Sequence, residues 1–469
     1  MSLQFNISRR NFLKNSAYVT VGFFGLRNFA TPTLKAQSYL NEVSGYGPLS
    51  PDPQLILDLP HGFQYKVLSR TGDFMNDGLR TPGAPDGMAA FPGPGDQTIL
   101  IRNHELLLDK TFQGPFGLEN ELFKNIDESK VYDAGIGGMP VLGGTTTVLY
   151  NHKKQKVLKQ FLSLAGTARN CAGGLTPWGT WISCEETTAR KGNFLTKDHG
   201  FNFEVLATTK NYLADPNPLV EMGRFNHEAV AVDPNSGVVF QTEDEVDGLI
   251  YRVIPNEYGK LINGGRLQAL SIKDNRSLDT RNWAKLNSSN IPIGSKMAVE
   301  WINLEDILSP NNDLRYQGFE KGAARFARTE GMWCGKGEIY FASTNGGNNL
   351  CGQIWRYTPS PYEGTQKEAK HPGYLELYIE PNDNRLLENC DNLTVAPWGD
   401  LIVCEDGPKD QYLRGITPEG KIYTLAHNNY SHDSELCGVC FAPKHPTLFV
   451  NIQRPGITLA ITGPWKTQI

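Results

Sequence analysis

The chain has 469 residues, and its 45 Lys and Arg against 50 Asp and Glu give a formal net charge of −5. A chain of this length can form two or three average domains, or one large repeat architecture with a well-buried core. Because the charges form no basic run and no block of one sign, a nucleic acid is excluded as the partner.

The first 36 residues have the pattern of a twin-arginine export signal. Arg9 and Arg10 precede Asn-Phe-Leu-Lys, and the moderately apolar run 17–26 that follows is too short to span a bilayer. No later segment is apolar enough for a membrane anchor. We therefore expect residues 1–36 to direct export through the twin-arginine machinery, and residues 37–469 to be a periplasmic or secreted protein that folds as a single domain.

The remainder of the chain is predicted to be all-β. Its 48 Gly and 29 Pro are spread throughout, among short β-branched and aromatic runs, which is typical of many short strands joined by turns. Helices are expected only as short insertions, over 118–130 and 299–308. The eight cysteines are compatible with some disulfides in an oxidising compartment, but the chain is too large to be a disulfide scaffold.

One stretch occurs twice in altered form, at 169–186 and at 389–406. Both copies have Asn-Cys near the front, Pro-Trp-Gly in the middle, and Cys-Glu-Glu or Cys-Glu-Asp at the end. Each predicts a β-hairpin whose second strand ends in acidic residues. Because a hairpin returns the chain to its starting point, the leading Cys and the trailing carboxylates are expected on the same edge.

Hairpins of this kind recur six times along the chain. They begin at Asp86, Arg169, Phe225, Arg328, Asn389 and Glu435. Further strand pairs lie between them, and 63–68 would supply an outer strand that closes the ring. Six repeats of four antiparallel strands predict a six-bladed β-propeller. The long gap from 244 to 328 must then contain an insertion.

The innermost strands of a propeller face its axis, so residues that flank them converge at one funnel. The sequence places there Cys171, Glu228, Glu330, Asn392 and Glu435, which enter inner strands, and Glu105, Glu185, Glu186, Glu243, Asp244, Asn345, Glu405 and Asp406, which leave second strands. So many carboxylates repel one another, which raises their pKa values or requires cations. The oxygen-rich set favours calcium or a ferric ion, and a Cys171 thiolate would suit a transition metal.

Some residues near the funnel are expected to have other roles. Cys184 and Cys404 lie inside strand patterns and are interpreted as small core residues. His104 and His227 are expected to orient the Glu that follows each of them. Arg328 either forms a salt bridge to a funnel acid or binds a phosphate or carboxylate group of a substrate.

Several motifs together resemble the PhoX family of alkaline phosphatases. They are Asn103-His104-Glu105, the Gly-Gly-Thr-Thr-Thr run at 143–147, the Asn-Cys-Ala-Gly-Gly to Cys-Glu-Glu block at 170–186, Asn226-His227-Glu228-Ala229, and the run 448–456. The resemblance extends over roughly residues 50–465 and is most specific in the block at 170–186. It implies a six-bladed propeller, exported by the twin-arginine route, that hydrolyses phosphate monoesters with a mixed iron and calcium cluster at the axis.

The resemblance also implies roles for individual residues. Cys171 would be the thiolate ligand of iron, with Glu228 and Glu330 as carboxylates on the iron side. The carboxylates on the iron and calcium side would be Glu105, Glu185, Glu186, Glu243 and Asp244. Arg328 would bind the phosphoryl group. In the second copy of the repeated stretch, we expect Asn392 to offer an oxygen in place of Cys390.

The leading hypothesis is a secreted, metal-dependent phosphatase that acts as a monomer on small phosphorylated substrates. One alternative is a lactonase propeller in which a single calcium ion polarises a lactone, and another is a non-catalytic binding propeller stabilised by calcium. Metal content separates these hypotheses, because Cys171 has no obvious role around a lone calcium ion.

Overall fold

The computed structural model describes residues 39–106, 113–286, 290–430 and 434–466. The chain divides into two units, residues 1–40 and 41–469, and all described strands belong to the second. The export signal predicted for residues 1–36 lies outside the described residues. In the described part of the chain, no helix is both long enough and apolar enough to cross a membrane.

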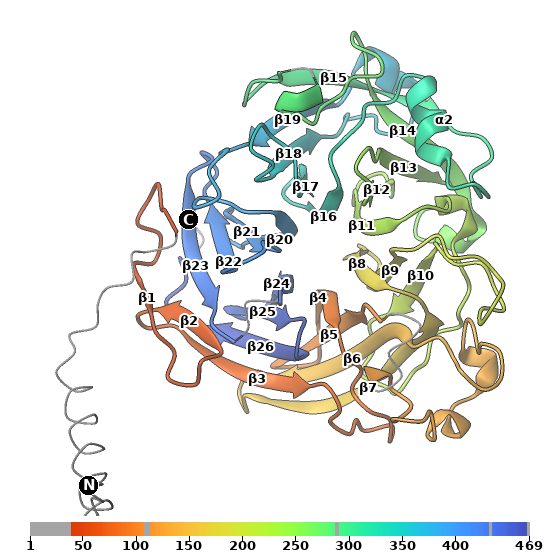
Figure 1. Ribbon diagram of the computed structural model, residues 1–469, viewed down its shortest axis with the longest axis vertical. Coiled ribbons are helices and arrows are strands. Elements are labelled where there is room, and N and C mark those ends of the chain that lie inside the picture. The colour runs from red at the N-terminus through yellow and green to blue at the C-terminus, as the bar shows by residue number, and fades with distance from the viewer. Residues whose placement is uncertain (1–38, 107–112, 287–289, 431–433, 467–469) are drawn as a thin grey trace, which may run out of the picture. The chain divides into compact units, whose positions relative to one another are not determined.

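The second unit is all-β, with its strands arranged around a central axis in a propeller-like fold (Figure 1). The strands closest to the axis are β4 (Pro85–Pro92), β8 (Asn170–Leu175), β11 (His227–Val232), β16 (Thr329–Cys334), β20 (Cys390–Val395) and β24 (Leu436–Phe441). Each contacts the next in chain order, and β24 contacts β4. The six innermost strands therefore form a closed ring.

Hydrogen bonding divides the strands into five antiparallel sheets. The first two contain β4 with β5 (Gln97–His104), β6 (Gly143–Asn151) and β7 (Lys156–Thr167), and β8 with β9 (Thr180–Glu185) and β10 (Asn202–Leu206). A third contains β20, β21 (Leu401–Glu405), β22 (Tyr412–Ile416), β23 (Ile422–Asn428), β2 (Leu57–Pro60) and β1 (Leu49–Ser50). A fourth joins β24, β25 (Thr447–Ile452) and β26 (Ile457–Thr462) to β3 (Gln64–Arg70), so an N-terminal strand closes the last sheet as predicted.

The fifth sheet has nine strands and corrects the predicted blade count. Its order is β11, β12 (Val239–Glu243), β13 (Ile250–Pro255), β14 (Gly265–Ile272), β15 (Lys296–Asn303), β19 (Tyr374–Ile379), β18 (Gln353–Thr358), β17 (Ile339–Ser343) and β16. The prediction of six separate four-stranded blades is wrong, because β15 pairs with both β14 and β19 and joins what would be two sheets. The insertion predicted between 244 and 328 supplies this strand.

The helix predictions are partly wrong. Most of 299–308 is strand β15 or loop, since its Val, Trp and Ile residues favour an extended backbone on a half-buried surface. Within 118–130 the structure has only two short 3-10 helices, Phe123–Asn125 and Glu128–Lys130. The α-helix α2 (Leu314–Glu320) lies in the insertion after β15.

Apolar side chains pack between neighbouring sheets and hold the ring together. One cluster joins Met88 and Leu100 of the first sheet to Cys440 and Phe449 of the last. Full burial of a large apolar side chain contributes about 1.5–3 kcal/mol. Because the sheet faces supply this burial, the strand ends at the axis are free to carry polar side chains.

Candidate active site

Each innermost strand contains a β-bulge at the same place. In all six, the pairing with the second strand slips by one residue near the start of the innermost strand. The slip follows the first paired position in five strands and the second, Cys437, in β24. The first residues inside these bulges are Asp86, Cys171, Glu228, Glu330, Asp391 and Gly438. Because a bulge re-aims the side chain that it displaces, the bulges direct five potential ligands to one region at the axis.

A second ring is formed by the residues that follow the second strands. These are Glu105, Glu186, Asp244, Thr344, Asp406 and Gln453. Each donates its backbone N–H to a carbonyl just before the neighbouring innermost strand, so the same local geometry recurs six times. All six line one cavity of about 410 Å³.

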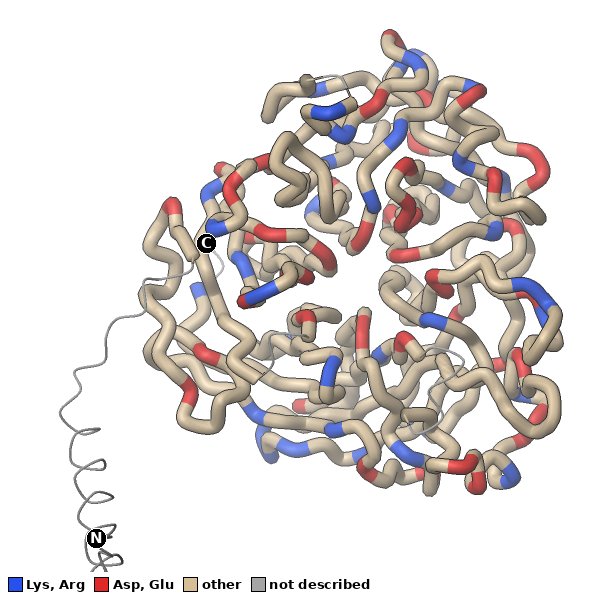
Figure 2. Tube along the Cα trace, viewed as in Figure 1, with Lys and Arg blue, Asp and Glu red and all other residues tan. Residues whose placement is uncertain are grey.

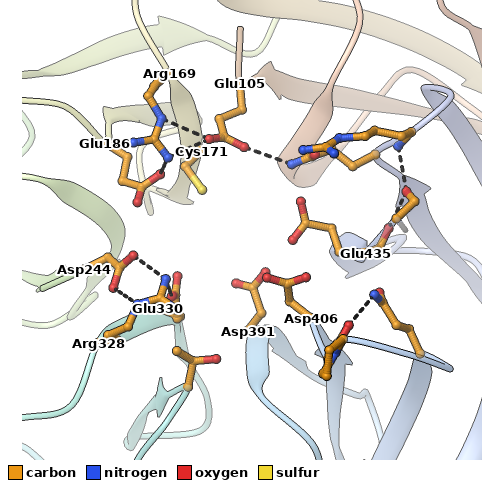
Figure 3. A pocket seen from close by; sticks show the side chains of 17 residues that line it. Glu105, Arg169, Cys171, Glu186, Asp244, Arg328, Glu330, Asp391, Asp406 and Glu435 are labelled. Atoms are coloured by element: carbon orange, nitrogen blue, oxygen red, sulfur yellow. Dashed lines mark hydrogen bonds and ion pairs between the residues drawn. The ribbon is translucent and has the colours of Figure 1, made fainter. Parts of the chain in front are cut away.

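Several Asp and Glu positions lie around the axis (Figure 2), and the cavity is strongly acidic (Figure 3). Its walls carry the seven acidic residues Glu105, Glu186, Asp244, Glu330, Asp391, Asp406 and Glu435, against the three arginines Arg169, Arg328 and Arg454, and also Cys171. Asp86 and Glu228 are buried behind this wall, within reach of Cys171. The excess of carboxylates requires protons or bound cations.

Potential ligand atoms lie close enough together to share ions. The Cys171 Sγ is 3.3 Å from Oε1 of Glu228 and 3.9 Å from Oδ2 of Asp86. Among the residues that the structure describes, four sets of three have ligand atoms within 4.8 Å of one another: Asp86, Glu105 and Cys171; Cys171, Glu186 and Glu228; Glu228, Glu330 and Asp391; and Asp86, Glu435 and Cys437. Oε2 of Glu228 and Oδ1 of Asp86 are buried with no hydrogen-bond partner among the described residues.

The electrostatics of the cavity disfavour a full set of negative charges. Burial, together with neighbouring carboxylates, raises well above their ordinary values the pKa values of Asp86, Glu186, Glu228, Glu330 and Glu435. Burial and the charge of Asp406 raise the pKa of Asp391 to about 8. Burial and the Asp86 carboxylate likewise raise the pKa of the Cys171 thiol. Cations would relieve these penalties, since they favour the charged forms.

Two arginines compensate part of the negative charge (Figure 3). Arg328 forks onto Asp244, with its Nε 2.9 Å from Oδ1 and its Nη2 2.6 Å from Oδ2, and it also contacts Glu330 at 3.0 Å. Arg169 bridges Glu105 at 2.9 Å and Glu186 at 2.6 Å. Both arginine side chains are partly exposed and line the cavity, so they stand at its rim.

The structure brings most of the predicted site residues together. Glu105, Cys171, Glu186, Asp244, Arg328 and Glu330 line the cavity, and Glu228 lies directly beside Cys171. From the wider funnel prediction, Glu435 and Asp406 also line it.

Glu185 and Glu243 are not among the lining residues. The Glu185 carboxylate accepts hydrogen bonds from the backbone N–H groups of Ala168, Gly200 and Phe201 and lies 2.6 Å from His199. Successive side chains of a strand point to opposite sides, so the residue before each cavity acid faces away from the cavity.

Glu243 and Glu405 follow the same rule. Glu243 accepts from the Tyr251 hydroxyl at 2.8 Å, and Glu405 is 2.7 Å from Nε of Arg414. These residues stabilise the ends of their strands instead of facing the cavity.

Asn392 is also displaced from the predicted position. It is the second residue of its bulge, and its Oδ1 accepts the N–H of Gly438 at 2.6 Å. The carboxylate that faces the cavity from this strand is Asp391.

Asp391 and Asp86 were missed as candidate ligands. Both occupy the bulge position that Cys171 occupies in its own strand, so a residue-by-residue comparison of the six hairpins would have found them. The sequence prediction names Asn392, which directly follows Asp391 on the same strand.

The predicted role of the two histidines is wrong. The His104 ring bonds to the carbonyl of Gly83 and to Thr146, and His227 contacts the carbonyl of Gly223. Burial lowers the pKa of His227 to about 3, so this ring is neutral. Both histidines secure the backbone near the cavity and do not orient a glutamate. Cys184 and Cys404 are buried in the core, as predicted.

The fold is propeller-like, and its axial cavity combines many carboxylates with a cysteine and with arginines at the rim. Such a set of groups suits cations with an anion beside them. A family model described as alkaline phosphatase PhoX matches residues 44–456. The chain therefore belongs to the PhoX alkaline phosphatase family, and the protein is a phosphatase. This membership favours the phosphatase hypothesis over the lactonase and the binding propeller.

A solved structure with a TM-score above 0.5 supports this fold. Pseudomonas fluorescens PhoX in complex with vanadate, a transition state analogue, aligns with a TM-score of 0.62 and 16% identity, over 91% of this chain and 97% of that chain. A virginiamycin B lyase from Staphylococcus aureus has 12% identity over 85% and 99% of the two chains, with a TM-score of 0.37. A gluconolactonase from Xanthomonas campestris has 10% identity over 91% and 100%, with a TM-score of 0.37. A sequence comparison with curated proteins returns no match.

Proposed function

We propose that the axial cavity hydrolyses phosphate monoesters with iron and calcium bound among its carboxylates. The observation that carries the proposal is the contact between Cys171 and Glu228, 3.3 Å apart at the base of an acidic cavity. A thiol among so many carboxylates is poorly placed as a free group, since burial and negative neighbours disfavour its ionised form. A metal ion at this position would bind the thiolate and satisfy the orphaned Oε2 of Glu228.

The donor types suggest how the ions would be divided. Ferric iron accepts a thiolate with carboxylates, so Cys171, Glu186 and Glu228 would hold it. Calcium prefers oxygen ligands alone, which suits Glu228, Glu330 and Asp391. Asp86, with its orphaned Oδ1, and Glu435 would complete the sites on the β24 side.

The chain itself supplies anion binding and charge balance. Bound cations would neutralise phosphoryl oxygens and lower the pKa of a water molecule. Arg328 would donate to a phosphoryl oxygen from its third nitrogen, Nη1, while Asp244 and Glu330 hold the other side of the guanidinium. An anion held at this rim would lie beside the carboxylate sets, and no serine nucleophile is needed for such a reaction.

The remaining expectations are part of the same proposal. The protein would be exported through the twin-arginine machinery on the signal in residues 1–36, and act in the periplasm or outside the cell as a monomer without a membrane anchor. We also infer that the two halves of the nine-stranded sheet act as separate blades joined by β15, which would give six radial units.

The test measures metal content and p-nitrophenyl phosphate hydrolysis in a variant that carries both Cys171→Ala and Glu228→Ala. We expect loss of iron and of hydrolysis together. Cys334→Ala is the matched control, because this cysteine is also partly exposed and lies on an innermost strand, but does not line the cavity. If the double variant keeps both its iron and its activity, the assignment of the site is wrong.

A further inference from the structure

Arg169 and Arg328 occupy the same structural position in different parts of the ring. Each stands two residues before a bulge ligand, Cys171 or Glu330, and one residue before the first paired position of its innermost strand. Their backbones are alike, with φ of 48° for Arg169 and 44° for Arg328, and both carbonyls accept the same kind of N–H from a residue of the second ring. Left-handed backbone in non-glycine residues is costly and is concentrated at functional sites.

The corresponding positions in the rest of the ring carry no cation. Judged by the carbonyl that accepts the N–H of a second-ring residue, they are Ala84, Asn226, Asn389 and Glu435. The left-handed backbone recurs at Ala84 and Asn389, so this conformation is shared by several of the six hairpins. An arginine at this position occurs in only two of them.

The two arginines also use their donors in the same way. In each, Nε and Nη2 bond to carboxylates, and no described residue accepts a hydrogen bond from Nη1. Their side chains are 35% and 39% exposed, and both line the same cavity. A guanidinium group that is held by carboxylates through Nε and Nη2 can still donate from Nη1 to an oxyanion.

We propose that Arg169 is a second substrate-binding arginine, which donates through Nη1 to the phosphoryl group that Arg328 also binds. The inference rests on the proposed phosphatase site. Glu105 and Glu186 hold the Arg169 guanidinium as Asp244 and Glu330 hold that of Arg328. Two fixed cations flanking one oxyanion would spread its negative charge over two sides.

The experiment measures binding of inorganic phosphate to metal-loaded protein by calorimetry, together with metal content, in Arg169→Ala, Arg169→Lys and Arg328→Lys. We expect Arg169→Ala to weaken phosphate binding about 10- to 100-fold, as for the loss of a charge-assisted hydrogen bond. Arg169→Lys keeps the positive charge that balances Glu105 and Glu186 but cannot fork. It should retain the metals and still weaken phosphate binding about fivefold or more, as should Arg328→Lys.

Arg385→Ala is the matched control. Arg385 forks onto Asp383 through Nε and Nη2 in the same way, but lies away from the cavity, so its removal should leave phosphate affinity within about twofold. Phosphate affinity within twofold of the parent in a fully metal-loaded Arg169→Lys protein would overturn the inference, and this variant decides the matter if Arg169→Ala loses its metals. A parent protein that neither binds phosphate nor hydrolyses p-nitrophenyl phosphate would refute the proposed function instead.

Discussion

Asp391 should make the metal-free protein less stable as the pH rises. Its carboxyl is buried in the cavity, and burial together with the nearby charge of Asp406 raises its pKa from 3.8 to about 8. Between these values the folded protein holds a proton that the unfolded chain has lost. Stability therefore falls as the pH rises from 3.8 to about 8, and the penalty is complete above that window.

The size of this penalty is large compared with the stability of a domain. A pKa raised by about four units corresponds to ~5 kcal/mol when the carboxyl is forced to ionise. Typical free energies of unfolding are about 5–15 kcal/mol. Removal of the metal ions should therefore leave a protein that melts several degrees lower at about pH 9 than at about pH 5.5.

Asp391→Asn isolates the contribution of this carboxyl. In metal-free protein at about pH 9, the variant should melt at a higher temperature than the parent, because an amide cannot ionise. In metal-loaded protein the same variant should melt at a lower temperature, since Asp391 is proposed to bind a cation. Glu305→Gln is the control, because the Glu305 side chain is 87% exposed and its loss should change neither measurement appreciably.

Thermal melts at both pH values, with and without a chelator, test this reasoning directly. The reasoning is refuted if the parent protein without metals is as stable at about pH 9 as at about pH 5.5, or if Asp391→Asn shifts the melting temperature in the same direction with and without metals.

Other changes test separate parts of the site. Cys171→Ser should lower bound iron more than bound calcium, since only iron gains from a thiolate; equal loss of both metals by elemental analysis would contradict this division. Glu186→Gln should reduce metal content, whereas Glu185→Gln should lower the melting temperature by disturbing the His199 contact while sparing metal content; the reverse pattern would show that the alternation along the strand is misassigned. Burial alone would lower the pKa of His199, but Glu185 and Asp133 raise it to about 9, so its stabilising charge is present below about pH 6.5 and is lost as the pH rises to about 9. Between about pH 6.5 and 9, His199→Gln should reduce the pH-dependent loss of the free energy of unfolding by up to ~3 kcal/mol. An unchanged dependence of the free energy of unfolding on pH would count against the buried ion pair.

The fold was predictable because turns and strand ends repeat along the chain. Pro-Trp-Gly turns and acidic strand ends marked the hairpins, and 63–68 was correctly placed as the strand that closes the last sheet. The merging of two sheets was not predictable, since β15 comes from an insertion whose edge pairing with β14 and β19 depends on tertiary contacts.

The convergence of acidic residues at the strand ends was predictable, but at several strand ends the residue that faces the cavity was not. Sequence reasoning found that acids converge there, but pairs such as Glu185 and Glu186 carry the same chemistry in both positions, and only the strand register shows which one faces the axis. At Asp391 the bulge shifted the ligand one position ahead of the predicted Asn392. In a bulge, two residues of one strand lie opposite a single residue of the partner strand. Amino-acid composition does not reveal which two residues these are.

Elemental analysis of the folded, exported protein, combined with p-nitrophenyl phosphate hydrolysis before and after chelation, decides whether the axial cavity is an iron and calcium phosphatase site. We expect bound iron together with calcium, loss of hydrolysis when the metals are removed, and recovery when both are restored. Protein that contains no iron and hydrolyses the ester at the same rate after chelation would contradict this expectation.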